Sequence, residues 1–338
     1  MAGRTSGRSR LGRAGRIGAA IVGTIVLALV LTVLGFRSAA AWRERFDADV
    51  VAPSTGRYVA TRSGRIFFQE AGPRDGVAVV LFHGTAAWSE LWRRTMSALA
   101  NGGFRVIAID IPPFGYSDRF GGYTRTEQAG RVRDVLDQLA IPTAIIVGHS
   151  FGAVAAAETV LRFPDRVRGL VLVDAALGLT APAGAPSSPP LFLRYGWFRE
   201  IVVSLTITNP LATRTLLAMF IEKKERATPE YVAILQRPLV IRRTTHDLGA
   251  WLLYFLSGDG DALSADRKAY AAITTRTAII WGDKDSVTPL AQAHDLRALI
   301  PTSTLSTLVG VGHIPQIEDP EAFNRVLVEQ LVILTKAA

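Results

Sequence analysis

The chain has 338 residues, 49% of them hydrophobic, which is enough to bury the core of one large domain and a smaller insertion. It has no cysteine, and this excludes disulfide bonds, a thiolate nucleophile and metal sites built on cysteine. The net charge of +9 comes mostly from eight arginines in the first 45 residues, so we expect no nucleic-acid partner, which would need basic residues clustered on the folded body.

The first predicted element is a membrane-spanning helix over 17–36. This run of 20 residues lies between Arg16 and Arg37 and contains no charged residue. At about 1.5 Å per residue it spans ~30 Å, the thickness of the hydrocarbon core of a membrane. The arginine-rich residues 1–16 favour a cytoplasmic N-terminus, which would place the rest of the chain on the outer side. Residues 37–55 would then form a juxtamembrane linker.

A cleaved signal peptide is the alternative interpretation of this segment. Ala39 and Ala41 form an A-x-A cleavage site, and cleavage there would release a secreted protein. The apolar run, however, is longer than that of a usual signal peptide, and Arg37 stands between the run and the site. We therefore favour an uncleaved anchor.

The body of the chain contains short, apolar, β-branched runs separated by helical or loop-like stretches. Runs such as VAVVLF and TAIIWG are apolar at nearly every position, which is typical of strands buried on both faces of a parallel sheet. Helices on both sides of such a sheet give an α/β fold. The predicted strands are 65–69, 77–82, 105–110, 144–148, 170–174, 277–282 and 303–309.

A helical insertion interrupts the strands between Asp174 and Thr277. It begins with a stretch rich in Pro, Gly and Ser, 181–190, which predicts a linker. Three helices are expected after it, over 211–223, 229–236 and 239–256. The predicted division of the body is a core over 56–180, a helical cap over 181–269 and a second part of the core over 270–338.

The strand 144–148 leads into Gly148-His149-Ser150-Phe151-Gly152, the G-x-S-x-G pattern of a nucleophile elbow. A serine on this sharp turn exposes its hydroxyl, and the flanking glycines let strand and helix approach closely. The small, helix-forming residues of 153–161 complete the strand-turn-helix context. We predict Ser150 as a catalytic nucleophile.

A serine nucleophile needs a base, and the predicted base is His313. This residue follows the last strand in a glycine-rich loop, 310–313, which can reach back over the edge of the sheet. The other histidines lie in the elbow, at an early strand end and in two helical stretches: His149, His83, His246 and His294.

The acid that orients the base is predicted in the loop after strand 277–282. Asp285 lies further past the strand end than Asp283, where a loop carboxylate can meet the far nitrogen of His313. Asp283 and Asp174, at the end of an earlier strand, are the alternatives. The chain order Ser, Asp, His is the one that accompanies this elbow.

The negative charge that develops on a substrate oxygen needs two donors, usually backbone N–H groups. One is predicted at Phe151, directly after the nucleophile. The other is predicted at Thr85, in the loop after strand 77–82. The backbones of these residues matter more than their side chains.

Five segments carry a family resemblance in the same order along the chain: HGTAAWSELW (83–92), DIPPFGYSD (110–118), GHSFGA (148–153), WGDKDSVTP (281–289) and VGHIPQIEDPEAF (311–323). Together they resemble the α/β-hydrolase superfamily, in its cap-bearing branch of epoxide hydrolases, haloalkane dehalogenases, carbon–carbon hydrolases and many esterases. The resemblance implies a mostly parallel central sheet flanked by helices, with an inserted helical cap. It also implies Asp285 as the triad acid, and Asp110 as a structural residue that braces the loop up to Asp118.

One residue of the motifs decides the expected chemistry. Dehalogenases and epoxide hydrolases use an aspartate where this chain has Ser150, and a serine forms an acyl-enzyme. The resemblance therefore implies hydrolysis of a carboxylic ester, with no cofactor and no metal. The carbon–carbon hydrolases also use serine, but their residue after the histidine is typically tryptophan, whereas Ile314 stands here. Carbon–carbon bond hydrolysis, perhydrolase-type chemistry and ligand binding without turnover are the alternatives.

The expected partners are a small apolar ester-like substrate and a membrane, the latter through residues 17–36. How the cap packs sets the shape of the pocket, so aromatic residues of the cap are candidate pocket walls. Each of them is equally suited to an ordinary helix core. These residues are Trp197, Phe198, Phe220, Trp251, Tyr254 and Phe255.

Overall fold

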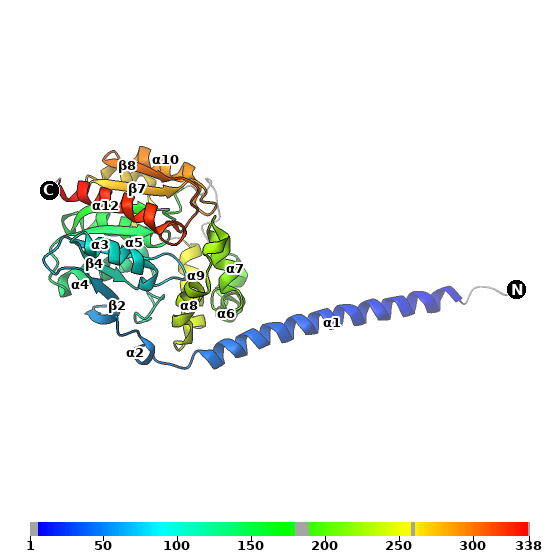
Figure 1. Ribbon diagram of the computed structural model, residues 1–338. Helices are drawn as coiled ribbons and strands as arrows, with labels where there is room; N and C mark the ends of the chain where they lie inside the picture. The colour runs from blue at the N-terminus through cyan, green and yellow to red at the C-terminus, as the bar shows by residue number, and fades with distance from the viewer. Residues whose placement is uncertain (1–5, 180–188, 258–260, 337–338) are drawn as a thin grey trace.

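The computed structural model describes residues 6–179, 189–257 and 261–336, and its body is built around one eight-stranded sheet (Figure 1). The strand order is β1-β2-β4-β3-β5-β6-β7-β8. Strands β4 to β8 pair in parallel, and β1 and β2 add an antiparallel edge, which confirms the expected α/β fold. The strands are β1 (Gly56–Thr61), β2 (Gly64–Ala71), β3 (Ala78–Phe82), β4 (Arg105–Ile109), β5 (Ala144–His149), β6 (Val167–Val173), β7 (Thr277–Gly282) and β8 (Ser303–Leu308).

Helices cover both faces of the sheet. They are α3 (Arg93–Asn101), α4 (Arg125–Gln138), α5 (Gly152–Arg162), α10 (Leu290–Leu299), α11 (Pro315–Glu318) and α12 (Pro320–Lys336), with the short α2 (Ala48–Val51) near the N-terminal side. Short 3-10 helices connect them: η1 (Ser89–Trp92), η2 (Pro164–Arg166), η3 (Leu191–Arg194), η4 (Lys224–Arg226), η5 (Arg237–Val240), η6 (Leu263–Ala265) and η7 (Arg267–Ala272).

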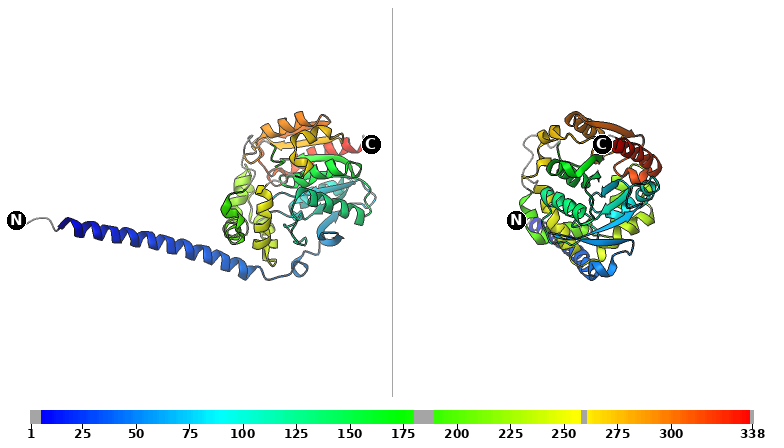
Figure 2. Two further views of the ribbon diagram at one scale, coloured as in Figure 1. Left: turned by 180° about the vertical axis from the view of Figure 1, so that it is seen from behind. Right: turned by 90° about the vertical axis from the view of Figure 1, so that its left-hand side faces the viewer.

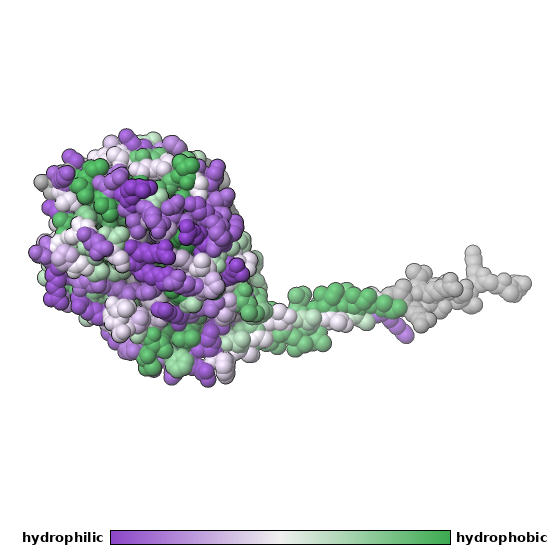
Figure 3. Space-filling view, viewed as in Figure 1, coloured by the Kyte–Doolittle hydropathy of each residue, from purple (hydrophilic) through white to green (hydrophobic). Residues whose placement is uncertain are grey.

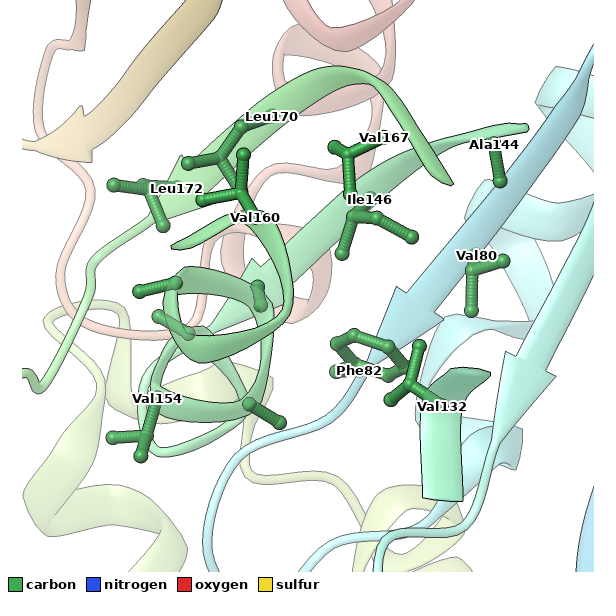
Figure 4. Close-up of a cluster of buried hydrophobic side chains, with 14 of the residues drawn as sticks. Val80, Phe82, Val132, Ala144, Ile146, Val154, Val160, Val167, Leu170 and Leu172 are labelled. Atoms are coloured by element: carbon green, nitrogen blue, oxygen red, sulfur yellow. The ribbon is translucent and has the colours of Figure 1, made fainter. Parts of the chain in front are cut away.

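Alternate residues of the central strands point to opposite faces, and both faces are buried. Val80 and Phe82 of β3 belong to the cluster that includes α4, α5 and α10. Figure 4 shows both with Val132 of α4. Val79 and Leu81 belong to the cluster on the other face, with α3 and α12. Burial on two faces explains why these strands are continuous apolar runs in the sequence.

All seven predicted strands are confirmed to within three residues at each end, and the described structure adds an eighth, β1. Strand β1 lies at the edge of the sheet, and only Val59 of its six residues is buried. It therefore lacks the apolar run by which the other strands were predicted. The predicted linker 181–190 lies outside the described residues, apart from its last two.

Four helices separate β6 from β7 in the described chain: α6 (Gly196–Leu205), α7 (Thr213–Phe220), α8 (Pro229–Gln236) and α9 (Thr244–Ser257). Helix α8 has the predicted bounds, and α7 is shorter than predicted. The helix expected over 239–256 is divided into η5 and α9, because Arg243 has a left-handed backbone (φ 62°) that a continuous helix excludes. Helix α6 was not predicted. The division at 56–180, 181–269 and 270–338 stays a prediction.

Helix α1 (Ser6–Arg43) is longer than the predicted span 17–36. Its apolar part projects away from the body (Figure 3). Residues 15–32 are all exposed. The stretch Gly15–Arg43 reaches a mean hydropathy of 2.7, so by length and composition it could cross a membrane, although a signal sequence meets the same criteria. The structure thus confirms one N-terminal apolar helix.

The end of α1 is fastened to the helices that follow β6. Arg43 donates hydrogen bonds to the carbonyls of Thr208 at 2.6 Å and Leu239 at 3.2 Å. The carboxylate of Glu44 accepts hydrogen bonds from the backbone N–H and the hydroxyl of Thr245. Thr245 lies in the first turn of α9, where backbone N–H groups have no partner inside the helix. Glu44 therefore caps α9 from outside the helix.

We predict that Glu44→Ala loosens the first turn of α9. Loss of a helix cap costs about 1 kcal/mol, which corresponds to roughly fivefold faster exchange of the amide hydrogens of that turn. Hydrogen-exchange mass spectrometry on the detergent-solubilised protein measures this. The control is Glu225→Ala, which removes an exposed carboxylate after α7 and should leave α9 unchanged. Equal exchange of α9 in all three proteins would contradict the capping role.

Candidate active site

Ser150 stands on a strained turn between β5 and α5. Its backbone is left-handed, with φ at 52°, which side chains rarely adopt. The two flanking glycines leave no room for a side chain: a Cβ at Gly148 would lie 2.6 Å from the Cα of Ala153, and a Cβ at Gly152 would lie 2.5 Å from the carbonyl oxygen of His83. The chain therefore folds here as the elbow that the G-x-S-x-G pattern predicts.

The structure brings Ser150, His313 and Asp285 together. The Nε2 of His313 lies 2.8 Å from the Oγ of Ser150, and its Nδ1 lies 2.8 Å from Oδ2 of Asp285. All three residues are buried, with exposed fractions of 8%, 2% and 6%. Since an ionised carboxylate can only accept, the proton of Nδ1 faces Asp285, and Nε2 is free to accept the hydroxyl proton of Ser150. This arrangement can activate a serine for nucleophilic attack.

The carboxylate of Asp285 is held in place by its own loop. Its Oδ1 accepts the backbone N–H groups of Val287 and Thr288, at 2.8 and 2.9 Å, and its Oδ2 accepts the hydroxyl of Thr288 at 2.6 Å. Burial acts to raise the pKa of Asp285, but the hydrogen bond and charge attraction of His313, with the bonds from Thr288, lower it below its ordinary value. Asp285 is therefore ionised at neutral pH.

The two alternative acids have other partners. Asp283 accepts the backbone N–H of Gly310 at 2.7 Å, and Asp174 accepts that of Gly282 at 2.9 Å. Burial, and next the neighbouring carboxylate of Asp285, raise the pKa of Asp174 well above its ordinary value. Asp174 directly follows β6 and binds the backbone of Gly282, whereas Asp285 lies on the loop after β7 and binds His313.

The predicted oxyanion donors lie at the nucleophile. Thr85 and Phe151 line the same cavity as the side chain of Ser150. The loop that carries Thr85 lies close to the elbow, since a Cβ at Gly84 would lie 3.0 Å from the Cβ of Ser150. Neither amide N–H is hydrogen-bonded within the described chain, so both can donate to an oxygen placed above Ser150.

Asp110 has the bracing position that the resemblance implies. Its buried carboxylate accepts the backbone N–H groups of Ser89 at 2.7 Å and Tyr116 at 2.8 Å. It ties together two loops at the ends of β3 and β4 and has no hydrogen bond to Ser150 or His313 in the described structure. Burial raises the pKa of Asp110 to about 6.

Two buried histidines form hydrogen bonds with the backbone of the loops around the site. His149 donates from Nε2 to the backbone carbonyl of His313 at 2.8 Å. His83 accepts the backbone N–H of Ile111 at 3.0 Å, so its other nitrogen, Nδ1, donates to the carbonyl of Gly84 at 2.8 Å. Burial lowers the pKa of His83 to about 4 and that of His149 to about 3, so both stay neutral. The ring of His149 lies beside that of His313, with 5.4 Å between the ring centroids, and lines the same cavity as Ser150.

Sequence reasoning missed Glu318, which holds the loop of His313. Its fully buried carboxylate accepts the backbone N–H of Gly312 at 3.0 Å and that of Ile314 at 3.2 Å, one on each side of His313. It also accepts the N–H of Glu222 at 2.8 Å, at the end of α7. The segment IPQIED gave no signal, because the role depends on backbone groups that meet only in the folded chain.

A cavity of about 310 Å³ lies over Ser150 and His313. Three of the six candidate cap residues line it, Phe220, Trp251 and Phe255, whereas Tyr254 lines a neighbouring cavity. No Lys, Arg, Asp or Glu lines it within the described residues. Its other apolar walls are Leu91, Ile207, Leu216, Leu217, Leu235, Leu239, Leu252, Val287, Ile314 and Ile317.

The sequence matches the profile of the alpha/beta hydrolase fold family over residues 77–320. An uncharacterized protein of Mycobacterium tuberculosis is 30% identical over 298 residues, which cover 85% of this chain and 84% of that protein. A 2-hydroxy-6-oxononadienedioate/2-hydroxy-6-oxononatrienedioate hydrolase of Cupriavidus pinatubonensis is 27% identical over 83% of this chain and 97% of its own length.

Solved hydrolase structures superpose on this chain. A meta-cleavage product hydrolase from Pseudomonas fluorescens superposes with a TM-score of 0.66 and 26% identity, over 81% of this chain and 97% of its own. A bacterial membrane phospholipase A superposes with a TM-score of 0.65 over 98% of this chain and 99% of its own. Its 22% identity shows likeness of fold alone.

We predict that the buried, neutral His83 makes the free energy of unfolding depend on pH. Its pKa of about 4 lies below the 6.5 of an exposed histidine, so below pH 6.5 only the unfolded chain takes up its proton. The stability that His83 contributes is complete above pH 6.5 and falls by about 1.4 kcal/mol per unit down to about pH 4.

Denaturant unfolding of the wild type and of His83→Gln between pH 8 and pH 5 tests this. The stability gap between the two proteins should be constant above pH 7 and shrink as the pH falls. Leu99→Ala removes buried apolar contacts without a titratable group, so its gap should stay constant. A constant gap for His83→Gln would show that His83 is not held neutral.

Proposed function

The chain belongs to the α/β-hydrolase family, and on that premise we propose that it is a membrane-anchored serine hydrolase of a neutral carboxylic ester with an apolar acyl group. Ser150 is the proposed nucleophile, His313 the base and Asp285 the acid. The proposal rests above all on one observation: the cavity over Ser150 is apolar and has no charged residue in its described lining.

The lining of the cavity favours a neutral ester over the dicarboxylate that names one of the relatives. The substrate that names the Cupriavidus enzyme is a dicarboxylate. Each carboxylate moved into an apolar site without a cationic partner costs several kcal/mol. A neutral ester has no such cost, and its acyl group gains from contact with residues such as Leu217 and Phe255. Carbon–carbon bond hydrolysis is therefore the second candidate, supported by the relatives but not by the cavity.

The proposed reaction has two steps. The Oγ of Ser150 attacks the ester carbonyl carbon while Nε2 of His313 takes the hydroxyl proton, and Asp285 stabilises the imidazolium that forms. The N–H groups of Thr85 and Phe151 stabilise the oxyanion. The bond to the alcohol then breaks, and His313 gives the proton to the leaving oxygen. A water, deprotonated by His313, attacks the acyl-enzyme and releases the acid, which restores Ser150.

Membrane anchoring is proposed from α1. This helix is exposed from residue 15 to residue 32 and carries no charged residue between Arg16 and Arg37, a length that matches a bilayer and would be costly to leave in water. The arginines that precede it support a cytoplasmic N-terminus and an outward-facing catalytic body.

We predict that kcat/KM on a series of chromogenic esters rises with acyl length until the cavity is full. Each buried methylene contributes about 0.8 kcal/mol, which is roughly fourfold in kcat/KM. Ser150→Ala should lose at least about 1,000-fold. Flat rates along the series, or rates that survive Ser150→Ala, would contradict the proposal.

Matched variants on α9 locate the acyl site. Leu252→Trp fills the cavity and should move the optimum to shorter esters, whereas Leu256→Trp, on the same helix but outside the lining, should not. A 2-hydroxy-6-oxodienoate in the same assay tests carbon–carbon bond hydrolysis, the second candidate function. A carbon–carbon bond hydrolase would turn over this compound in preference to the esters.

We predict that the chain stays uncleaved and in the membrane. After expression with a C-terminal tag, the full-length protein should remain in the membrane pellet after alkaline carbonate extraction. This treatment breaks electrostatic contacts with the membrane but does not extract an inserted apolar helix. Ala39→Leu with Ala41→Leu should leave size and location unchanged. A soluble product with a new N-terminus after Ala41, abolished in this double variant, would establish a signal peptide instead.

A further inference from the structure

Helix α1 packs along α6 before it leaves the body. Val33, Phe36, Arg37 and Ala40 are the partly or fully buried residues of this stretch, and their spacing of three and four places them on one face of α1. α6 is in contact with α1. Arg37 forms an ion pair with Glu200 in the middle of α6.

The contacts also fix the direction of α6. Arg37 reaches Glu200 within α6, and Arg43 reaches the carbonyl of Thr208, just after α6 ends. Helices α1 and α6 therefore run parallel, and the N-terminal end of α6 points toward the exposed apolar part of α1. The N-terminal end of α6 thus lies level with the point near Val33 where α1 becomes fully exposed.

This end of α6, with η3 before it, carries an apolar surface that no described residue covers. We call it the cap edge and define it as Leu191, Phe192, Tyr195 and Trp197, whose exposed fractions are 67%, 50%, 55% and 63%. The rings of Phe192, Tyr195 and Trp197 form a chain of aromatic contacts through Phe198. Two views place α6 on the side of the body toward which α1 extends (Figure 1, Figure 2).

We propose that the cap edge docks on the surface of the bilayer that α1 enters, so that the enzyme loads its ester from the lipid phase. This inference rests on the proposed membrane anchor. Tyr and Trp are enriched where proteins meet the boundary between lipid and water, because their rings combine an apolar body with a polar tip. The exposed Arg194 within the same edge can reach the phosphate groups of the lipids.

The cap edge is connected to the catalytic cavity through two helices. α6 packs against α9, which carries the cavity residues Trp251, Leu252 and Phe255. Ile207, just after α6, also lines the cavity. The helix that carries the cap edge is therefore in direct contact with a wall of the cavity.

Tryptophan fluorescence tests the docking directly. Of the six tryptophans, four are fully buried, and only Trp197 and Trp42 are exposed. Trp42 lies six residues beyond Phe36, the end of the proposed membrane span, about 9 Å further along α1. The full-length protein is reconstituted in phosphatidylcholine vesicles with and without bromine on the acyl chains, which quenches tryptophan in the lipid phase.

We expect Trp197→Phe to remove at least about half of the bromolipid quenching, and Trp42→Phe to leave it. Quenching that persists in Trp197→Phe would overturn the docking. This includes the case in which a second copy of the chain covers the cap edge, since protein contact would shield Trp197 from bromine. The conservative substitutions keep the fold, and the readout needs no enzyme activity.

A pair of esters tests loading from lipid. Leu191→Asp with Trp197→Asp should lower hydrolysis of a long-chain ester dissolved in the bilayer by at least about fivefold, while hydrolysis of a water-soluble butyrate ester stays unchanged. Ile333→Asp, on the exposed side of α12, is the matched control and should leave both rates unchanged. Unchanged rates on the embedded ester, or equal losses on both esters, would overturn the proposal. If the wild type hydrolyses neither ester faster than Ser150→Ala does, the result counts instead against the proposed function.

Discussion

The buried hydrogen-bond chain from Ser150 through His313 to Asp285 is the constraint on which the site depends. A polar group buried without a partner costs on the order of 1–3 kcal/mol, so the imidazole, the carboxylate and the loops that carry them must all be hydrogen-bonded at once. His149 donates a hydrogen bond to the backbone carbonyl of His313. The backbone N–H of His313 donates to the carbonyl of Phe220 at 3.2 Å. The position of the ring is therefore fixed by the elbow, the acid loop and the cap together.

The same network couples the cap to the core. Glu318 binds backbone amides on both sides of His313 and also the amide of Glu222, where α7 gives way to the next segment. At the opposite end of the cap, Glu44 and Arg43 fasten α9 and the end of α6 to the N-terminal helix. The helices that enclose the cavity are thus held between the catalytic loop and the proposed anchor. In this account the anchor also sets the orientation of the cavity toward the lipid.

The sequence predicts what depends on local chemistry. The elbow at Ser150 is specified by two glycines where any side chain would clash, and the buried strands by apolar runs. The choice of Asp285 over Asp283 followed from its distance past the strand end, and the structure gives only Asp285 a hydrogen bond to His313 among the three candidate acids. Glu318 was missed, because its partners are backbone N–H groups that meet it only in the folded chain. Strand β1 and helix α6 were missed because few of their residues are fully buried, one of six in β1 and two of ten in α6.

The central claim is that Ser150 carries the acyl group during turnover. The most direct measurement is rapid-quench mass spectrometry of the full-length protein mixed with the best chromogenic ester. The account predicts a covalent mass increase equal to the acyl group, on the peptide that contains Ser150, formed at the rate of the first release of alcohol. Release of alcohol without any adduct, or an adduct on another residue, would contradict it.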